Sequence, residues 1–336
     1  MAIHRHPPGQ IVFFMMLSTE KTISNIQFLQ ETLEGLHAEP KRMYSKYFYD
    51  ETGDQIFQKI MGMDEYYLTD AEMEIMKYQA DGIADAISKD GHGFDLIELG
   101  AGDATKSIHL LKKLIDKKLD FKYFPIDISA HVIEELSAGL PVKLPGLDFQ
   151  GLNGDYFDML KKASEISDRK KVVLFMGANI GNMSVSEARE FCADLKNILS
   201  KDDILIIGFD LKKNPKQILD AYNDKAGITR SFNLNLLSRI NRELEADFDL
   251  NAFDHYVTYD PETGACKSYL ISLKDQQVQI GDTAVHFSKD EYIFMEISQK
   301  YSLTEIEKLA EASGFKIMQY FSYRQNYFVD AVWKFA

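Results

Sequence analysis

A short apolar segment that breaks into a glycine turn constrains the fold of this chain more than any other feature. Residues 94–99 read FDLIEL, the turn that follows contains Gly100 and Gly102, and a helical pattern begins at about Thr105. Apolar segments of this kind are buried on both faces of a parallel sheet, and glycines let the backbone turn tightly and approach a ligand. The sequence therefore predicts a strand, a ligand-binding turn and a helix, as in doubly wound α/β folds.

The residues around the turn indicate which ligand it suits. A dinucleotide-binding turn would have a third glycine where Thr105 stands, and Glu98 at the strand end would repel a pyrophosphate. We expect Glu98 to point into the cleft, where a carboxylate favours a ligand with a positive charge and free amino and hydroxyl groups. S-adenosylmethionine has all of these. The alternative from the residues alone is an ordinary strand-to-helix turn with no ligand.

Composition excludes several classes of partner. The 336 residues carry a net charge of -14 without a long basic run, so neither nucleic acid nor an anionic membrane is an expected partner. Cys192 and Cys266 are the only cysteines, and the histidines are scattered, so we expect no disulfide framework and no metal site. This usage fits a reducing cytoplasm. A hydrophobic content of 45% is enough for two moderate domains.

The N-terminus contains an apolar run at residues 11–17 that is too short to span a bilayer and has no cleavage site after it. We expect residues 1–20 to be a disordered extension. Met15 or Met16 is then a candidate for the natural start, which N-terminal sequencing of the native protein would test.

Strands and helices alternate from residue 94 to residue 211, as in a parallel sheet. After the first strand, further strands are expected at 121–129, 147–152, 171–176 and 203–210. The second strand ends in Asp127, a position that reaches ribose hydroxyls in doubly wound sheets. Capping-box patterns predict three helix starts, at Thr69–Glu72, Ser184–Glu187 and Ser302–Glu305.

The alternation stops at about residue 212. Helical patterns and then short alternating segments up to about residue 300 predict an inserted domain with a small antiparallel sheet. A closing hairpin at 315–335 adds two late antiparallel strands to five parallel ones, which predicts an α/β fold of the Rossmann-like, class I methyltransferase type. The expected parts are residues 21–75 and 212–300 for substrate binding, 76–211 for binding S-adenosylmethionine, and 301–336 as a return to that domain.

Seven short motifs, none specific alone, make a specific set by their order and spacing. With these motifs the chain resembles the histidine-specific, S-adenosylmethionine-dependent Nα-methyltransferases that form hercynine in ergothioneine biosynthesis. The resemblance runs from about Pro40 to the C-terminus. The motifs are KYFYD (46–50), EYY (65–67), ELGAG (98–102), GANIGN (177–182), AYND (221–224), NRELEADF (241–248) and EISQK (296–300).

The resemblance implies a cofactor site for S-adenosylmethionine. It assigns the glycine turn to the methionine and sugar, and Asp127 to the ribose hydroxyls. A carboxylate that accepts from the exocyclic amine is expected beside the adenine. The residues expected to bind the cofactor are Glu98, Gly100, Gly102, Lys106, Asp127, Asp155 and Tyr156. Glu98 is included because of its position at the strand end.

The resemblance also implies a site for a small amino-acid substrate. Asn182 and Tyr222 would hold its carboxylate, while Tyr49 and Tyr66 would surround its amine, with Tyr49 helping the proton leave. The pair Glu296 and Ser298 would recognise an imidazole, because residues two apart on a strand share a face and can bond both ring nitrogens. A solvent-facing strand is the alternative explanation of that pair.

At three places the sequence departs from the family pattern, so other substrates and functions stay open as alternatives. Ala178-Asn179 stands where the family has a serine-threonine pair, the glycine turn reads GAGDA instead of GSGTS, and Ser268 falls where a methionine lines the imidazole pocket. Another amino acid or an arylethylamine-like substrate is therefore an alternative. An NAD-dependent oxidoreductase and a non-catalytic cofactor-binding protein are more distant alternatives. We expect a cytoplasmic monomer.

Overall fold

The computed structural model describes residues 25–336, and the chain in this range forms two compact units. We call residues 64–218, 259–266 and 297–336 the sheet unit, and residues up to 63, 219–258 and 267–296 the second unit. The expected extension at residues 1–20 and the alternative starts at Met15 and Met16 lie outside the described residues.

The sheet unit contains the glycine turn and a seven-stranded sheet in the order β11-β12-β5-β4-β1-β2-β3. Strands β1 to β5 run parallel to one another, whereas β12 is antiparallel to both β5 and β11. The late hairpin is therefore confirmed. The strands are β1 (Phe94–Leu99), β2 (Phe121–Asp127), β3 (Leu152–Asn153), β4 (Lys170–Phe175), β5 (Ile204–Asp210), β11 (Phe315–Ser322) and β12 (Phe328–Phe335).

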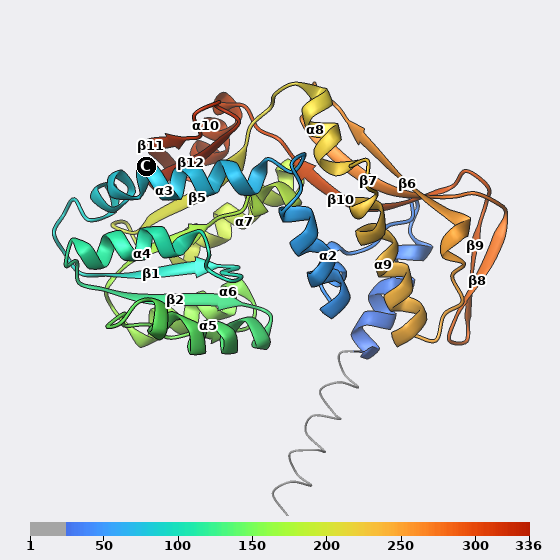
Figure 1. Cartoon of the computed structure of the whole chain (residues 1–336), viewed down its shortest axis with the longest axis horizontal. Helices are drawn as coiled ribbons and strands as arrows, with labels where there is room; N and C mark the ends of the chain where they lie inside the picture. The colour runs from blue at the N-terminus through green and yellow to red at the C-terminus, as the bar shows by residue number, and fades with distance from the viewer. Residues whose placement is uncertain (1–24) are drawn as a thin grey trace, which may run out of the picture. The chain divides into compact units, whose positions relative to one another are not determined.

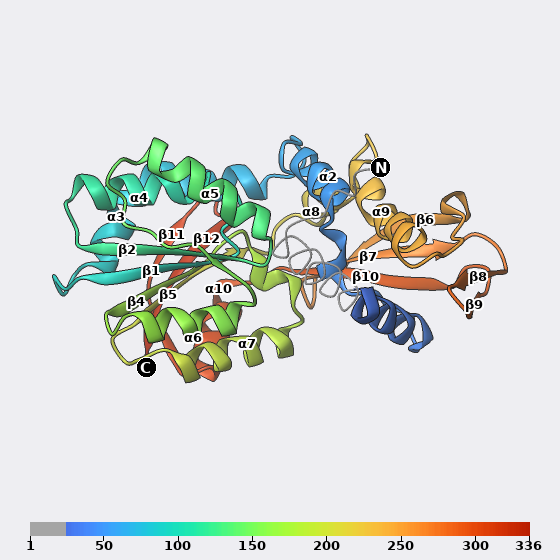
Figure 2. The same cartoon turned by 90° about the horizontal axis from the view of Figure 1, so that it is seen from below.

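Helices cover both faces of this sheet. Figure 1 labels them, and Figure 2 shows α3, α4 and α5 on one face with α6, α7 and α10 on the other. A separate apolar core fills each side, which is why every residue of β1 and β5 is buried. The helices are α3 (Leu68–Ile87), α4 (Ser107–Asp116), α5 (Ala130–Lys143), α6 (Tyr156–Ile166), α7 (Val185–Ile198) and α10 (Leu303–Ala312), with the 3-10 helix η2 (Asn179–Asn182).

The second unit combines helices with two small sheets instead of the single antiparallel sheet expected. One sheet has the order β10-β7-β6 and the other pairs β8 with β9. A helix over 25–37 precedes η1 (Ser45–Phe48), α2 (Glu51–Met61), α9 (Ile228–Glu243) and η3 (Leu250–Ala252). The strands are β6 (Phe253–Tyr259), β7 (Ala265–Ser272), β8 (Gln276–Ile280), β9 (Thr283–Phe287) and β10 (Tyr292–Gln299), and α8 (Pro215–Tyr222) crosses the boundary between the units along the chain.

Three local predictions differ from the structure. The strand expected at 147–152 is reduced to β3, with one isolated bridge from Tyr123 to Phe149. The boundary expected at residue 76 falls inside α3, and residues 64–75 belong to the sheet unit because α3 packs as one continuous helix on α4 and β12. The capping box expected at Thr69–Glu72 is wrong: α3 has Tyr67 as its N-cap with no side-chain cap, because Glu72 is buried.

Candidate active site

The glycine turn after β1 has a backbone that only glycine fits at its first position. Gly100 has φ +74°, and a Cβ there would lie 2.8 Å from Tyr156 Oη. Its N–H donates to the carbonyl of Ile126 at 2.9 Å, which fixes the turn to the end of β2. The ring of Tyr156 therefore lies directly against the turn.

Asp127 ends β2 and is held in place by the same turn. Its Oδ2 accepts from the backbone N–H of Gly102 at 3.2 Å, and its Oδ1 accepts from Ser129 N–H at 2.9 Å. Nothing lies within 4 Å of a Cβ built on Gly102, so there is open space beside the turn. A fixed carboxylate next to open space and a glycine backbone fits a ligand with a sugar diol, as a nucleoside cofactor has.

Asp155 and Tyr156 lie beside this carboxylate. Asp155 is the N-cap of α6 and accepts from Phe157 N–H at 2.9 Å. Burial raises the pKa of the Tyr156 phenol to about 12, and the charges of Asp127 and Asp155 add to the rise. The structure thus brings together five of the residues expected to bind the cofactor, from the turn after β1, the end of β2 and the start of α6.

Glu98 does not face an open cleft, which corrects the expectation about its direction. The residue is 3% exposed, and its carboxylate accepts hydrogen bonds from Ser107 and Tyr123. Burial raises the pKa of Glu98 to about 7, although both hydrogen bonds oppose the rise. Through these two hydrogen bonds Glu98 connects the start of α4 to β2, and so helps to fix the chain on either side of the glycine turn.

Glu72 was assigned to a helix cap from the sequence, and the structure gives it a different role. It is fully buried on α3, where Oε1 accepts from Gly177 N–H at 2.7 Å and Oε2 accepts from Lys106. Burial alone would lower the pKa of Lys106, but the Glu72 carboxylate raises it overall. Glu72 thus joins the loop after β1, through Lys106, to the loop after β4.

Asp330 on β12 lies near this ion pair. Its side chain is fully buried, and neither carboxylate oxygen has a hydrogen-bond partner within the described residues. Burial raises its pKa well above the usual value, and the charge of Glu72 raises it further. Asp330 is therefore favoured in its neutral form.

The loop after β4 carries Asn182 at the end of η2. Ala178, which precedes η2, has φ +56°, and Asn182 is exposed. A Cβ on Gly181 would lie only 2.9 Å from the carbonyl oxygen of Gln299, so η2 packs closely against the end of β10. This approach brings the loop that carries Asn182 next to the segment that follows Ser298.

A buried charged network surrounds Asp210 at the end of β5. Lys300 Nζ lies 2.6 Å from Asp210 Oδ2, Tyr67 Oη donates to the same oxygen at 2.8 Å, and Lys213 pairs with Oδ1. Burial would raise the pKa of Asp210, but the two lysines lower it overall. Lys300 Nζ also donates to Ser298 Oγ at 2.8 Å, so the network reaches a residue expected to bind substrate.

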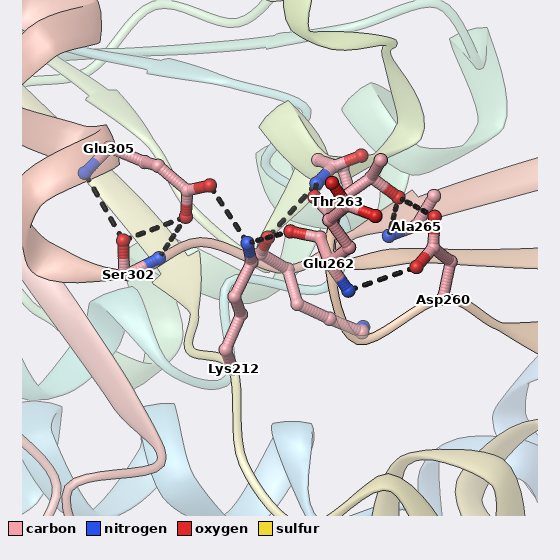
Figure 3. Close-up of polar contacts among 9 residues, drawn as sticks. Lys212, Asp260, Glu262, Thr263, Ala265, Ser302 and Glu305 are labelled. Atoms are coloured by element: carbon pink, nitrogen blue, oxygen red, sulfur yellow. Dashed lines mark hydrogen bonds and ion pairs between the residues drawn. The ribbon is translucent and has the colours of Figure 1, made fainter.

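Figure 3 shows a second polar cluster, which includes Lys212, Glu262, Ser302 and Glu305. Lys212 Nζ donates to the carbonyl of Glu262 at 2.9 Å and to Glu305 Oε1 at 2.8 Å, while Glu305 completes the capping box of α10 with Ser302. The N–H of Lys300 donates to the carbonyl of Gly264 at 2.8 Å. Gln299 Nε2 donates to the carbonyl of Lys300 at 3.0 Å, so both backbone polar groups of Lys300 are held.

Tyr49, Tyr222 and Glu296 belong to the second unit. Tyr49 is 45% exposed, and its ring packs edge-on against Phe57 and Phe232 with centroids 5.6 Å and 5.9 Å away. Tyr222 is buried at the end of α8, and Glu296 is half-buried on β10.

Asp50 fixes the backbone next to Tyr49. Its carboxylate caps α2 at Gly53 N–H and accepts from Asn235 Nδ2 at 2.9 Å and from Arg242. The contacts with Asn235 and Arg242 join the start of α2 to α9, next to the aromatic cluster of Tyr49.

The sheet unit holds the other three expected substrate residues, Tyr66, Asn182 and Ser298. Tyr66 is partly buried and packs on the core formed with α3 and α4. The sequence reasoning gave no role to Asp210, Lys213 or Lys300. Asp210 could have been found by the rule that singled out Asp127, since both carboxylates end a parallel strand.

The sheet order and the glycine turn together define the class of protein. A parallel sheet with a last strand inserted antiparallel beside β5, and a nucleoside-type turn after β1, is the class I methyltransferase fold. Over residues 25–336, no helix has the length and apolar character needed to cross a membrane. Within the same range no three His, Cys, Asp or Glu side chains gather as a metal site.

Comparison with known proteins gives the family. The family described as histidine-specific methyltransferase, SAM-dependent, matches residues 28–335. A histidine N-alpha-methyltransferase of Mycolicibacterium smegmatis is 34% identical over 281 residues, which cover 83% of this chain and 86% of that protein. Another of Mycobacterium tuberculosis is 30% identical over 287 residues, covering 85% and 88%. Ergothioneine biosynthesis protein 1 of Neurospora crassa is 32% identical over 296 residues, 86% of this chain but 32% of that protein.

The chain belongs to the family of histidine-specific, S-adenosylmethionine-dependent methyltransferases. The predicted fold class, cofactor and type of enzyme, an S-adenosylmethionine-dependent N-methyltransferase, are thereby confirmed, and the reading as an NAD-dependent oxidoreductase is set aside.

Proposed function

We propose that this enzyme transfers methyl groups to the α-amino nitrogen of L-histidine and forms Nα,Nα,Nα-trimethylhistidine (hercynine). The observation that carries the proposal is the Glu296-x-Ser298 pair on β10 in a chain of this family, because this pair offers an acceptor and a hydroxyl on one strand face. The names of the Mycolicibacterium and Neurospora relatives support both the substrate and the pathway. We also propose that the enzyme works as a monomer in the cytoplasm.

The sheet unit is proposed to bind the cofactor. Gly100 and Gly102 take its methionine and sugar, Asp127 takes the ribose hydroxyls, and Asp155 with Tyr156 takes the adenine. The contacts of Asp127 with Gly102 and Ser129 support this, since they hold a carboxylate beside open space. Lys106 and Glu98 are proposed to fix the turn, because both bond within the protein.

The proposed substrate contacts fall into three groups. Asn182 and Tyr222 bind the carboxylate, Tyr49 and Tyr66 surround the amine, and Glu296 with Ser298 recognises the ring. Asn182 is an exposed donor at the end of η2, which supports its role. The second unit is accordingly proposed to contribute to substrate binding, through Tyr49, Tyr222 and Glu296.

The protein has to supply an uncharged amine in the correct orientation. Bound S-adenosylmethionine supplies an activated methyl group, so no nucleophilic side chain is needed and positioning is the main contribution. The amine of free histidine is mostly protonated at neutral pH, and burial disfavours that charged form. Tyr49 is proposed to orient the amine through its hydroxyl and to help the proton leave.

Aromatic rings suit the product of repeated methylation. Each step makes the amine bulkier, and the last gives a permanent cation, which aromatic faces attract. Tyr49 stands against Phe57 and Phe232 in the second unit, which supports a role for this cluster around the methylated nitrogen.

Calorimetry and mass spectrometry test the substrate. Histidine and a panel of amino acids and aromatic amines are titrated into the protein with S-adenosylhomocysteine, and turnover products are identified by mass. We expect histidine to bind tightest and to yield the trimethylated product. If another compound binds more tightly than histidine, that compound is the better candidate for the substrate. Ala178 and Asn179 depart from the family pattern, which is why other amino acids and aromatic amines are included.

Tyr49→Phe tests the proposed role of the hydroxyl. Loss of one hydrogen bond to the reacting amine is expected to lower kcat by about tenfold to a hundredfold. Tyr256→Phe is the matched control, since Tyr256 is a 57% exposed tyrosine of the same unit with no proposed role. Full-rate methylation at every step by Tyr49→Phe would remove Tyr49 from the mechanism.

A further inference from the structure

Lys300 is a fully buried lysine placed directly after β10. Its side chain has 0% exposure, and its Nζ lies 2.6 Å from Asp210 Oδ2, which is equally buried. An ammonium group loses its hydration on burial, and a paired carboxylate is needed to offset that loss. Lys213 already pairs with the other oxygen of Asp210, so a second lysine at this carboxylate calls for an explanation.

The hydrogen bond from Lys300 to Ser298 gives that explanation. Nζ lies 2.8 Å from Ser298 Oγ, and an ammonium group has donors but no acceptor. Ser298 Oγ must therefore accept, and its own proton has to be donated away from Lys300. The bond is charge-assisted, which polarises the hydroxyl and makes it a stronger donor.

We propose that Lys300 is a specificity-determining positioning residue that sets Ser298 as a hydrogen-bond donor, so that the enzyme selects a ring with an unprotonated nitrogen. This rests on the proposed function, in which Glu296 and Ser298 recognise the ring of histidine. Neutral imidazole has one N–H for the Glu296 carboxylate and one bare nitrogen for Ser298. Imidazolium has two N–H groups and would meet Ser298 donor to donor, and an indole ring lacks the bare nitrogen.

The groups that surround Lys300 include Asp210, Lys213, Tyr67 and Tyr259. Asp210 on β5 has a lowered pKa, because two lysines outweigh the effect of its burial. Burial lowers the pKa of Lys213 to about 8, and Lys300 contributes to the decrease. Tyr67 bonds to Asp210, and burial raises the pKa of Tyr259 on β6. The imidazole ring has a pKa of about 6.5. Lys213→Met removes the surrounding group whose pKa lies nearest to this value, and Glu98, with a pKa of about 7, is present in every variant. A difference in pH dependence between Lys300→Met and Lys213→Met therefore reports on how Ser298 meets the ring.

Lys300→Met and Lys213→Met form a matched pair of variants. Each removes one of the two lysines at Asp210 and leaves the other, together with Tyr67, to pair with the carboxylate. Lys300→Met also removes the donor to Ser298, whereas Lys213→Met leaves that bond in place.

Histidine is titrated into each protein by calorimetry at about pH 7.5 and pH 5.5, with S-adenosylhomocysteine saturating. For the wild type and Lys213→Met, Kd is expected to rise about tenfold at the lower pH, as the neutral ring becomes scarce. For Lys300→Met, the Ser298 hydroxyl can rotate and accept, so the rise is expected to be less than about threefold, from a Kd that is about tenfold weaker at pH 7.5. Such a change in pH dependence would not come from a general loss of structure.

A folded Lys300→Met variant with the tenfold pH effect of the wild type would overturn the inference and leave the proposed function intact. A wild type that neither binds nor methylates histidine would instead overturn the proposed function. If Lys300→Met does not fold, Ser298→Ala decides in its place: loss of the pH effect supports the donor role, and a retained tenfold effect overturns it.

Discussion

At the scale of single residues, two carboxylates at the ends of neighbouring strands have different surroundings. Glu98 and Asp127 both lie at the ends of neighbouring parallel strands, and both were expected to face the cofactor. Glu98 is buried against Ser107 and Tyr123, whereas Asp127 is partly exposed and accepts from backbone N–H groups of the turn. The direction of a side chain at a strand end depends on which helix covers that face, and a sequence does not state this.

Glu98→Gln tests the cost of the buried carboxylate. Because burial raises the pKa of Glu98 from 4.5 to about 7, its contribution to stability is complete below about pH 4.5 and is lost as the pH rises through about 7. Glutamine stays neutral, so the free energy of unfolding of the variant relative to wild type is expected to rise by about 3 kcal/mol from about pH 4.5 to pH 8. Urea denaturation at both pH values measures it. An equal difference at both would contradict the raised pKa.

At the scale of elements, two of three predicted capping boxes form. Ser184 with Glu187 starts α7 and Ser302 with Glu305 starts α10, both with reciprocal hydrogen bonds. At α3, Glu72 is instead drawn into the core by Gly177 and Lys106. The glutamate of a capping pattern can also form an ion pair with another element. At α3, Glu72 pairs with Lys106 in the core instead of capping the helix at the surface.

Ser302→Ala and Thr69→Ala test this difference between helices. Removing the cap of α10 is expected to lower the free energy of unfolding by about 1 kcal/mol, since the backbone N–H of Glu305 loses its partner. Thr69 makes no cap, so its substitution is expected to change the free energy by less than about 0.5 kcal/mol. Thermal and urea unfolding of both variants provide the measurement. A loss at Thr69 as large as that at Ser302 would restore the cap predicted from sequence.

At the scale of the whole molecule, the expected binding residues are divided between two units. The residues expected to bind the cofactor all belong to the sheet unit, whereas the expected substrate residues come from both units. Alternation of strands and helices predicted the sheet unit well, because each βαβ step is a local pattern. The second unit is assembled from three separate segments of the chain, and no local pattern states which segments join.

Hydrogen exchange with stepwise addition of ligands tests this division. S-adenosylhomocysteine at about one hundred times its Kd is expected to slow exchange at residues 100–106 and 127–129, and to stabilise the protein by about 2.7 kcal/mol. Histidine added afterwards is expected to slow exchange near Tyr49 and Tyr222 in the second unit. Asp127→Asn should weaken the first effect at fixed ligand concentration. Protection by S-adenosylhomocysteine that leaves residues 100–106 unchanged would contradict the cofactor site.

The sequence alone determined the class of fold, the glycine turn and the identity of the residues in the family motifs, because these depend on local patterns of apolar residues, glycines and short polar groups. Only the tertiary structure decided that Glu98 and Glu72 are buried, that Asp330 lies beside an ion pair, and that Lys300 joins Asp210 to Ser298. Two of these pairings, Lys106 with Glu72 and Lys300 with Asp210, join residues 34 and 90 positions apart. Their energies come from burial and charge at close range, and both arise only when distant segments pack together.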